Sequence, residues 1–330
     1  MPYAENSSIF WMGGRLATDL LDVSHDPECL DDGGFWAVST TFENQFVAAK
    51  FSTVTDAPFP EFEWTPLQGT WSSSKDVNAY LSYVEEIKSL IAQGWVYQVN
   101  ACRRLTHPDD GQSLRGLFNE ILKNNPAPWA SYLEIPETMI ASASPELFLS
   151  RDGSLVKSSP IKGTQPSNTA NFGSKDQAEN VMIVDLMRND LGRICKSGTV
   201  AVPRLLSSEE HPGLQHLVSD VQGELLDGLS WSEILEALSP PGSVSGAPKS
   251  SAIQVIADHE DFRGPYCGAL GWVEGDQAVL SVAIRTFWKD KQINFGTGAG
   301  ITWGSNPISE WEETQLKSRR LIAIAGGELL

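Results

Sequence analysis

The sequence predicts an α+β fold, with antiparallel strands and separate amphipathic helices sharing one large domain. Three observations lead to this expectation. Asp152-Gly153 lies between two apolar runs and is a strong hairpin signal. Residues 266–300 alternate strand-like runs with turn residues, as in an antiparallel meander. Residues 76–93 carry apolar side chains at three- and four-residue spacing, which is typical of a helix packed on a core.

Composition limits the class of protein and its partners. No linker-like run divides residues 1–330, so we expect a single domain. Lys and Arg number 24 against 42 Asp and Glu, a formal net charge of −18 that disfavours nucleic acid and anionic membranes. No apolar run approaches the roughly 20 residues that span a membrane, and no secretory signal is recognisable, so we expect a cytoplasmic protein. The cysteines lack paired spacing for zinc and are expected to be unpaired thiols: Cys29, Cys102, Cys195 and Cys267.

The amino-terminal region, residues 1–70, is expected to form an edge sheet packed on the main body. Its apolar runs at 10–11, 35–38 and 46–51 indicate short strands, separated by acidic loops that contain Gly and Pro. The main body is then expected over residues 75–325.

The main body begins with the helix at 76–93, which Gly94 ends. The next strand, 95–105, is expected to present Gln98, Asn100 and Arg103 on one alternating face. Residues 198–225 are expected to form two strands joined by a charged loop, and Ser230-Trp231-Ser232-Glu233 is a capping-box pattern. The remaining helices are expected at 114–124, 176–192, 231–238, 248–258 and 309–324, and the remaining strands at 130–135, 139–143, 147–149, 266–273, 279–288 and 293–300.

Glu146 and Lys162 are the first candidates for chemistry. Glu146 lies between two apolar strand-like runs, so its carboxyl group has core residues as neighbours. Lys162 is expected in a turn marked by Pro160 and by Gly163, which allows a close backbone approach to a ligand. Taken alone, the two residues are better explained as an ordinary ion pair beside a hairpin, and further motifs are needed to favour chemistry.

Two helices each carry a pair of carboxylates three residues apart. Asp176 and Glu179 share one side of the first helix, and Glu310 and Glu313 share one side of the last, with Lys317 one turn further. If the helices face each other, they can hold a divalent ion. Mg²⁺ fits best, because it accepts a few carboxylates and keeps several waters. The alternative for any single pair is a solvated helix face.

The second half of the chain supplies candidates for binding an anion. Loop 240–249 exposes backbone amides ahead of a helix, a position that favours negative charge. Arg285 is placed on a strand to make a two-pronged pair with a carboxylate. A surface arginine remains an alternative for Arg285, and a structural hydrogen-bonding role remains one for His216.

Several of these segments follow one another in an order that resembles the chorismate-utilising enzymes over residues 75–325. The family includes anthranilate synthase component I, aminodeoxychorismate synthase component I, isochorismate synthase and salicylate synthase. The resemblance implies two large, mostly antiparallel sheets packed face to face, with helices outside and the site between them. The segments that carry it are Ser144-Pro145-Glu146-Leu147, Pro160 to Thr164, Gln215 to Ser219, Gly242 to Lys249, Arg285, Gly296 to Ile301 and Glu310 to Lys317.

The resemblance also implies roles for residues of this chain. Glu146 matches the general acid, and Glu179 and Glu313 match the ligands of Mg²⁺, with Asp176 and Glu310 nearby and acting through water. Gln98 stands where relatives that add water to chorismate carry a lysine base, so water activation is not expected and the position belongs to the ammonia side of the pocket. The residues expected to bind the substrate are Thr164, His216, Ser243, Tyr266, Gly268, Arg285, Gly298, Gly300 and Lys317.

Lys162 indicates the branch of the family. Aminodeoxychorismate synthases typically carry Lys there, whereas the other branches usually carry Ala, so the resemblance implies amination of chorismate to 4-amino-4-deoxychorismate for p-aminobenzoate and folate. An amine can form a covalent intermediate that ammonia opens. No glutamine-hydrolysing motif is recognisable, so ammonia is expected from a separate glutamine amidotransferase subunit. This sequence departs from the family pattern at Gln165, where many relatives carry an arginine that would favour the neutral form of the Lys162 amine.

Two alternatives remain at the level of sequence. One is anthranilate synthase component I, although the Leu-Leu-Glu-Ser signature of tryptophan-regulated members is not found. The other is a catalytically silent chorismate-binding regulatory subunit. Retention of Glu146, Lys162, Glu179 and Glu313 argues against the silent subunit.

Overall fold

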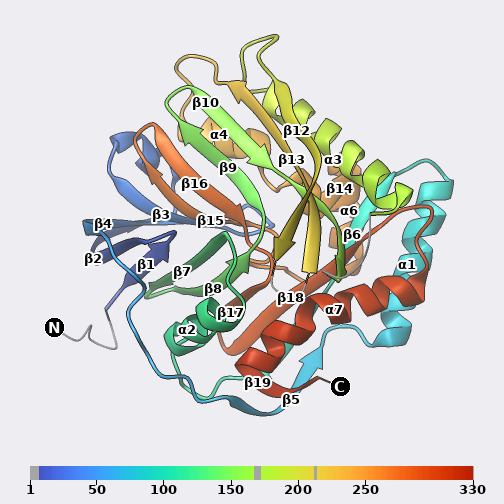
Figure 1. The fold of residues 1–330 in the computed structure, drawn as a ribbon, viewed down its shortest axis with the longest axis horizontal. Helices are drawn as coiled ribbons and strands as arrows, with labels where there is room; N and C mark the ends of the chain where they lie inside the picture. Colours follow the sequence, from blue (N-terminus) through green and yellow to red (C-terminus); the bar gives the residue numbers. More distant parts are fainter. Residues whose placement is uncertain (1–6, 167–171, 212–213, 330) are drawn as a thin grey trace.

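The computed structural model describes residues 7–166, 172–211 and 214–329. Within these residues the α+β class and the mostly antiparallel pairing are confirmed (Figure 1). The strands are β1 (Ile9–Met12), β2 (Arg15–Ser24), β3 (Phe35–Thr40), β4 (Phe46–Asp56), β5 (Leu67–Ser73), β6 (Gln98–Pro108), β7 (Trp129–Ile135), β8 (Thr138–Ser144), β9 (Leu147–Asp152), β10 (Leu155–Ser159), β11 (Ile161–Pro166), β12 (Ala201–His211), β13 (Leu214–Glu224), β14 (Gly246–Ala247), β15 (Ala269–Glu274), β16 (Gln277–Val282), β17 (Thr286–Lys289), β18 (Gln292–Ile301) and β19 (Gly326–Leu329).

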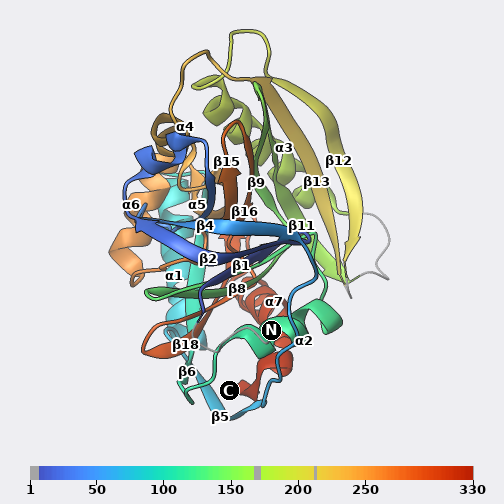
Figure 2. The same cartoon turned by 90° about the vertical axis from the view of Figure 1, so that its left-hand side faces the viewer.

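The hydrogen-bonded ladder is continuous and has two halves. One half runs β5–β6–β18–β17–β8–β7, and the other runs β15–β16–β9–β10–β13–β12, with β11 also paired to β13. Strands β1, β2, β4 and β3 join them, because β1 pairs with β7 and β3 pairs with β15. The expectation of an amino-terminal edge sheet is therefore wrong. Figure 2 shows β1, β2 and β4 crossing the middle of the molecule between the two halves.

The predicted helices appear close to their expected positions. They are α1 (Val77–Ala92), α2 (Arg115–Asn124), α3 (Ser174–Gly192), α4 (Trp231–Leu238), α6 (Lys249–His259) and α7 (Pro307–Ala325). The 3-10 helix η1 (Pro27–Asp32) and the short helix α5 (Gly242–Ser245) were not predicted, and α5 lies within the segment expected as loop 240–249. The capping box of α4 is confirmed, since the Ser230 hydroxyl accepts from the Glu233 amide at 3.2 Å and the Glu233 carboxylate accepts from the Ser230 amide at 2.9 Å.

Four details of the strand prediction differ from the structure. Strand β6 begins at Gln98 rather than at residue 95, and Arg103 lies on the face opposite Gln98 and Asn100 because side chains alternate along a strand. The segment expected as one strand at 279–288 is broken at residues 283–285, where the chain passes from β16 in one half to β17 in the other. The charged loop expected within 198–225 is part of the long strand β12.

The interior contains two hydrophobic clusters. The larger joins α1, α3, α4 and α6 to the strands around β3, β9 and β15. The smaller joins α2 and α7 to β7, β8, β17 and β18. The four cysteines form no disulfide, and three of them are buried, as expected. Among the described residues, no helix is long and apolar enough to cross a membrane.

Candidate active site

One cavity gathers most of the predicted site residues between the two halves of the sheet. Strands β6, β11, β13 and β18 and helices α3, α5 and α7 all contribute to its wall. The predicted residues that line it are Glu146, Lys162, Asp176, Glu179, His216, Ser243, Tyr266, Arg285, Gly298, Gly300, Glu310, Glu313 and Lys317. Residues separated by up to 217 positions in the sequence, from Asn100 to Lys317, therefore share one small space.

Glu146 lies in the link between β8 and β9 and is 3% exposed. Its backbone is fixed on both sides: its amide donates to the Ser144 hydroxyl at 3.2 Å, and its carbonyl accepts from the Val282 amide at 3.0 Å. Burial raises the pKa of the carboxyl group to about 7, although Ser243, Lys162 and Lys317 favour the ionised form. The group therefore holds its proton at pH values where an ordinary glutamate has lost it.

Lys162 lies within strand β11 and not in a turn as expected. It is paired with Leu217 of β13, and the register shifts at Gly163, which has a φ of 76°. Burial lowers the pKa of the Lys162 amine, and the positive charge of Lys317 lowers it further, whereas the nearby carboxylate of Glu179 acts in the opposite direction. The net shift makes the neutral amine, which is the nucleophilic form, easier to reach than in an ordinary lysine.

Gly300 of β18 leaves room for two polar side chains. A Cβ atom at this position would lie 2.6 Å from Lys162 Nζ and 2.5 Å from Gln98 Nε2, so any larger residue would displace both. Gln98 is fully buried, and both polar atoms of its amide lack a hydrogen-bond partner within the described chain. Because such groups are costly to leave unpaired, this corner of the site suits a small polar ligand.

Arg285 occupies the break between β16 and β17 with a φ of 52°. Its Nη2 donates to His216 Nε2 at 2.8 Å, so the ring proton of His216 lies on Nδ1, which faces the Gly163 carbonyl at 3.4 Å. Burial lowers the pKa of Arg285 to about 10, and no carboxylate of the described residues forms an ion pair with it. A partly buried arginine of this kind is suited to bind an anionic ligand.

The acidic residues of α3 and α7 lie on the same cavity. Glu313 pairs with Lys317 at 2.6 Å, and Lys317 also donates to the Gly298 carbonyl at 2.9 Å. Glu179 accepts from the Thr302 hydroxyl at 3.3 Å, and Asp176 accepts from the Gly173 amide at 3.2 Å at the start of α3.

These acidic side chains match Mg²⁺ in the type of their donor atoms. Within the described chain, no three His, Cys, Asp or Glu side chains are close enough together to form a complete metal site. The donors are nevertheless all carboxylates facing one cavity, and Mg²⁺ typically takes one or two carboxylates and completes its shell with water and substrate oxygens. The residues present therefore suit this ion.

Three predicted residues differ from the rest in position. Gln98 adjoins the cavity beside Lys162. Gly268 lies away from it, because its Cα packs on the Thr40 carbonyl, where a Cβ would come within 1.9 Å. The side chain of Thr164 lies outside the described part of the structure.

Sequence reasoning did not assign several other residues to the cavity wall. They are Asn100, Ile161, Val244, Ile284, Phe295, Gly296 and Thr297, whereas Gly163, which also lines the wall, was expected to approach a ligand. Asn100 had a usable signal, since it shares a strand face with Gln98. The apolar residues carry no such signal, because they look like any other core position.

The cavity thus combines a buried proton donor with a partly buried amine, an arginine without a carboxylate partner in the described chain, and acidic residues on its wall. Such a pocket suits a small anion. The model of the family described as chorismate binding enzyme matches residues 37–323. The chain therefore belongs to that family, and the resemblance found in the sequence is confirmed.

Curated relatives fall into two named activities. The chain is 37% identical over 270 residues to anthranilate synthase component 1 of Saccharolobus solfataricus, an alignment that covers 78% of this chain and 64% of the relative. It is 34% identical over 268 residues to aminodeoxychorismate synthase component 1 of Bacillus subtilis, covering 76% and 56% respectively. The chain thus spans about three fifths of the length of these relatives, and their names do not separate the two activities.

A solved structure supports the fold. The putative 2,3-dihydroxybenzoate-specific isochorismate synthase of Bacillus anthracis superposes with a TM-score of 0.83 at 22% identity, covering 98% of this chain and 97% of that one. At this identity the likeness concerns the arrangement of strands and helices alone.

Proposed function

We propose that this chain is an aminodeoxychorismate synthase component I, which converts chorismate and ammonia to 4-amino-4-deoxychorismate, a precursor of p-aminobenzoate and folate. The observation that carries the proposal is Lys162, whose amine has a lowered pKa and faces the same cavity as Glu146. Ammonia would come from a separate glutamine amidotransferase.

Binding of chorismate follows from the charges on the cavity wall. The substrate has a ring carboxylate and an enolpyruvyl carboxylate, and Arg285 and Lys317 are the cations available to them. Arg285 has no carboxylate of the described chain to satisfy it, so a substrate carboxylate can take that place. Pairing in a buried site is stronger than in water, because fewer solvent dipoles compete.

Glu146 and Lys162 would carry the chemistry. The neutral Lys162 amine forms a bond to the ring while the bond to the 4-hydroxyl breaks, and Glu146 gives its proton so that the hydroxyl leaves as water. Ammonia then forms the new bond at carbon 4, the lysine amine leaves the ring, and Glu146 takes the proton that the ammonium nitrogen must lose. Gln98, with its amide unpaired beside Lys162, can hydrogen-bond the incoming ammonia.

Magnesium is part of the proposal. Glu179 and Glu313 would hold the ion, with Asp176 and Glu310 bonded to its waters. When bound, it would neutralise negative charge on the substrate and ease departure of the hydroxyl.

Anthranilate synthase component I is the second candidate, because a relative of that name is 37% identical to this chain. Incubation of the protein with chorismate, Mg²⁺ and ammonium separates the two. Anthranilate is fluorescent and has lost pyruvate, whereas aminodeoxychorismate retains the enolpyruvyl group and is recognised by its mass. Unchanged chorismate would instead indicate a silent binding subunit.

A further inference from the structure

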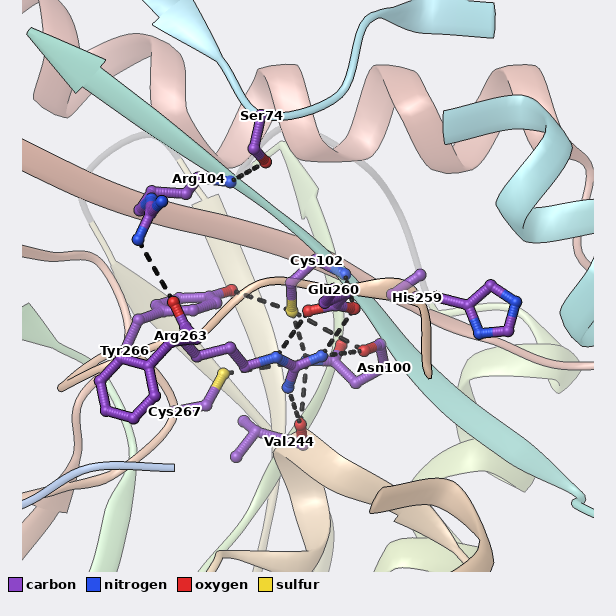
Figure 3. A network of polar contacts seen from close by, with 12 residues as sticks. Ser74, Asn100, Cys102, Arg104, Val244, His259, Glu260, Arg263, Tyr266 and Cys267 are labelled. Atoms are coloured by element: carbon purple, nitrogen blue, oxygen red, sulfur yellow. Dashed lines mark hydrogen bonds and ion pairs between the residues drawn. The ribbon is translucent and has the colours of Figure 1, made fainter. Parts of the chain in front are cut away.

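A buried ion pair lies directly behind one wall of the candidate active site (Figure 3). Arg263 and Glu260 follow α6, and their side chains are 3% and 5% exposed. Arg263 Nε donates to Glu260 Oε2 at 2.7 Å, and Nη2 donates to Oε1 at 2.9 Å. Neither residue lines the cavity in which the chemistry is proposed.

The remaining donors of the guanidinium reach two residues that do line the cavity. Nη2 donates to the Asn100 carbonyl at 2.7 Å, and Nη1 donates to the Val244 carbonyl at 3.2 Å. The Asn100 side-chain amide donates to the same Val244 carbonyl at 3.1 Å. Arg263 therefore ties strand β6 to helix α5, whose Ser243 lines the cavity together with Glu146.

Glu260 extends the connection to two more groups. Its Oε1 accepts from the Cys102 amide at 2.9 Å and from the Tyr83 hydroxyl at 3.0 Å. The carboxylate is thus joined to both β6 and α1, and the guanidinium it holds is joined to β6 and α5. A pair with this many directed bonds has one geometry, which a hydrophobic pair of the same volume would not impose.

We propose that the Arg263–Glu260 ion pair positions the active site by fixing Asn100 and the 242–245 segment relative to each other. This inference rests on the proposed function, since it concerns the same cavity. Neither charge touches the substrate. Their contribution is to hold Val244 and Ser243 where the buried proton donor and the substrate need them, because misplacement by about 1 Å can cost roughly 100-fold in rate.

The chain offers a matched control. Arg115 and Glu134 form a second, largely buried ion pair, with side chains 2% and 13% exposed and an Nε–Oε2 distance of 2.6 Å. Arg115 belongs to α2, and its described hydrogen bonds join it to Ser113, Glu134 and Ser7, none of which lines the active-site cavity. A lysine at either position keeps the charge but loses the planar fork of donors.

The experiment compares Arg263→Lys with Arg115→Lys. Chorismate consumption is measured with ammonium as nitrogen source, at a temperature well below the unfolding transition of both variants. We expect both to lose thermal stability, but only Arg263→Lys to lose kcat/KM, by roughly 10- to 100-fold. Equal activity of the two lysine variants, each within about twofold of the wild type, would overturn the positioning role.

A double variant covers the case in which Arg263→Lys does not fold. Arg263→Met combined with Glu260→Met removes both charges, a change that often preserves stability where removal of one charge does not. A folded double variant with kcat/KM at least tenfold below wild type supports the proposal, and one with wild-type kinetics overturns it. Wild-type protein that leaves chorismate unchanged would refute the proposed function itself, a result distinct from either.

Discussion

Replacement of Glu146 by Gln tests whether the buried carboxyl group is protonated near neutral pH. The folded protein has a pKa of about 7 for this group, against 4.5 for an ordinary glutamic acid. Between these values the folded state holds a proton that the unfolded state has released, so stability falls as pH rises through that window. The amide of Glu146→Gln stays neutral throughout and removes this dependence.

The size of the effect follows from the two pKa values. Their difference, from 4.5 to about 7, corresponds to roughly 3 kcal/mol at about 1.36 kcal/mol per factor of ten. We therefore expect Glu146→Gln and wild type to have similar free energies of unfolding at pH 4.5. By pH 8 the variant should be more stable by up to about 3 kcal/mol, yet inactive on chorismate, because it cannot donate a proton.

Urea unfolding of both proteins at several pH values from 4.5 to 8, without substrate or Mg²⁺, measures the difference directly. Other titrating groups cancel when the variant is compared with wild type at the same pH. A difference in unfolding free energy that does not change across this range would refute the raised pKa. A variant that retains full turnover would refute the role of Glu146 as proton donor.

Three further predictions concern the same cavity. Glu179→Gln and Glu313→Gln should each lower chorismate turnover at least tenfold and raise the Mg²⁺ concentration needed, as a metal titration would show; full activity of both variants in chelator would contradict the metal site. Arg285→Ala should raise the KM for chorismate by roughly 10- to 100-fold, while its melting temperature stays within a few degrees of the wild-type value. A variant that unfolds at room temperature would show that the arginine has a structural role. Wild-type protein quenched after incubation with chorismate and Mg²⁺ but no ammonia should carry a dehydrated-chorismate adduct, visible by intact-protein mass spectrometry, that Lys162→Ala lacks. An undiminished rate of aminodeoxychorismate formation by Lys162→Ala would mean that ammonia attacks the ring directly.

The helices were predictable because their signals are local. The apolar spacing of α1 and the Asp76 side chain, which accepts from the Ala79 amide at 2.8 Å, both lie within one stretch of sequence. The capping box of α4 is equally local. The bounds of the helices that were predicted accordingly agree with expectation to within one or two residues, whereas η1 and the four-residue α5 carry no periodic signal long enough to read.

Strand partners were less accessible, because pairing joins residues far apart in the chain. The run at 35–38 reads as a short apolar strand, and nothing in it shows that β3 pairs with β15, more than 200 residues later. The amino-terminal strands were therefore placed at an edge, whereas they bridge the two halves of the ladder. Side-chain patterns specify which face is buried, but not which strand lies alongside.

The predicted strand face of Arg103 was wrong for a simpler reason. It was grouped with Gln98 and Asn100, although strict alternation places residue 103 on the opposite face. There its Nε donates to the Thr314 hydroxyl at 3.0 Å, and its guanidinium lies 4.2 Å from the ring of Trp311. The arginine thus anchors α7 to β6 from outside the cavity.

The pKa of the Lys162 amine depends on residues that lie far from it in the sequence. The resemblance implies an arginine where this chain has Gln165, and a cation near Lys162 would lower the pKa of its amine. In the folded chain burial is the main cause of the lowered pKa of Lys162, and the positive charge of Lys317 adds to it. Lys317 belongs to α7, at the other end of the sequence, and Gly298 holds it in place through its carbonyl at 2.9 Å. Burial and Lys317 thus shift the pKa of the Lys162 amine in the same direction as a cation at position 165 would, provided that β11 stays paired with β13 and α7 stays docked on β18.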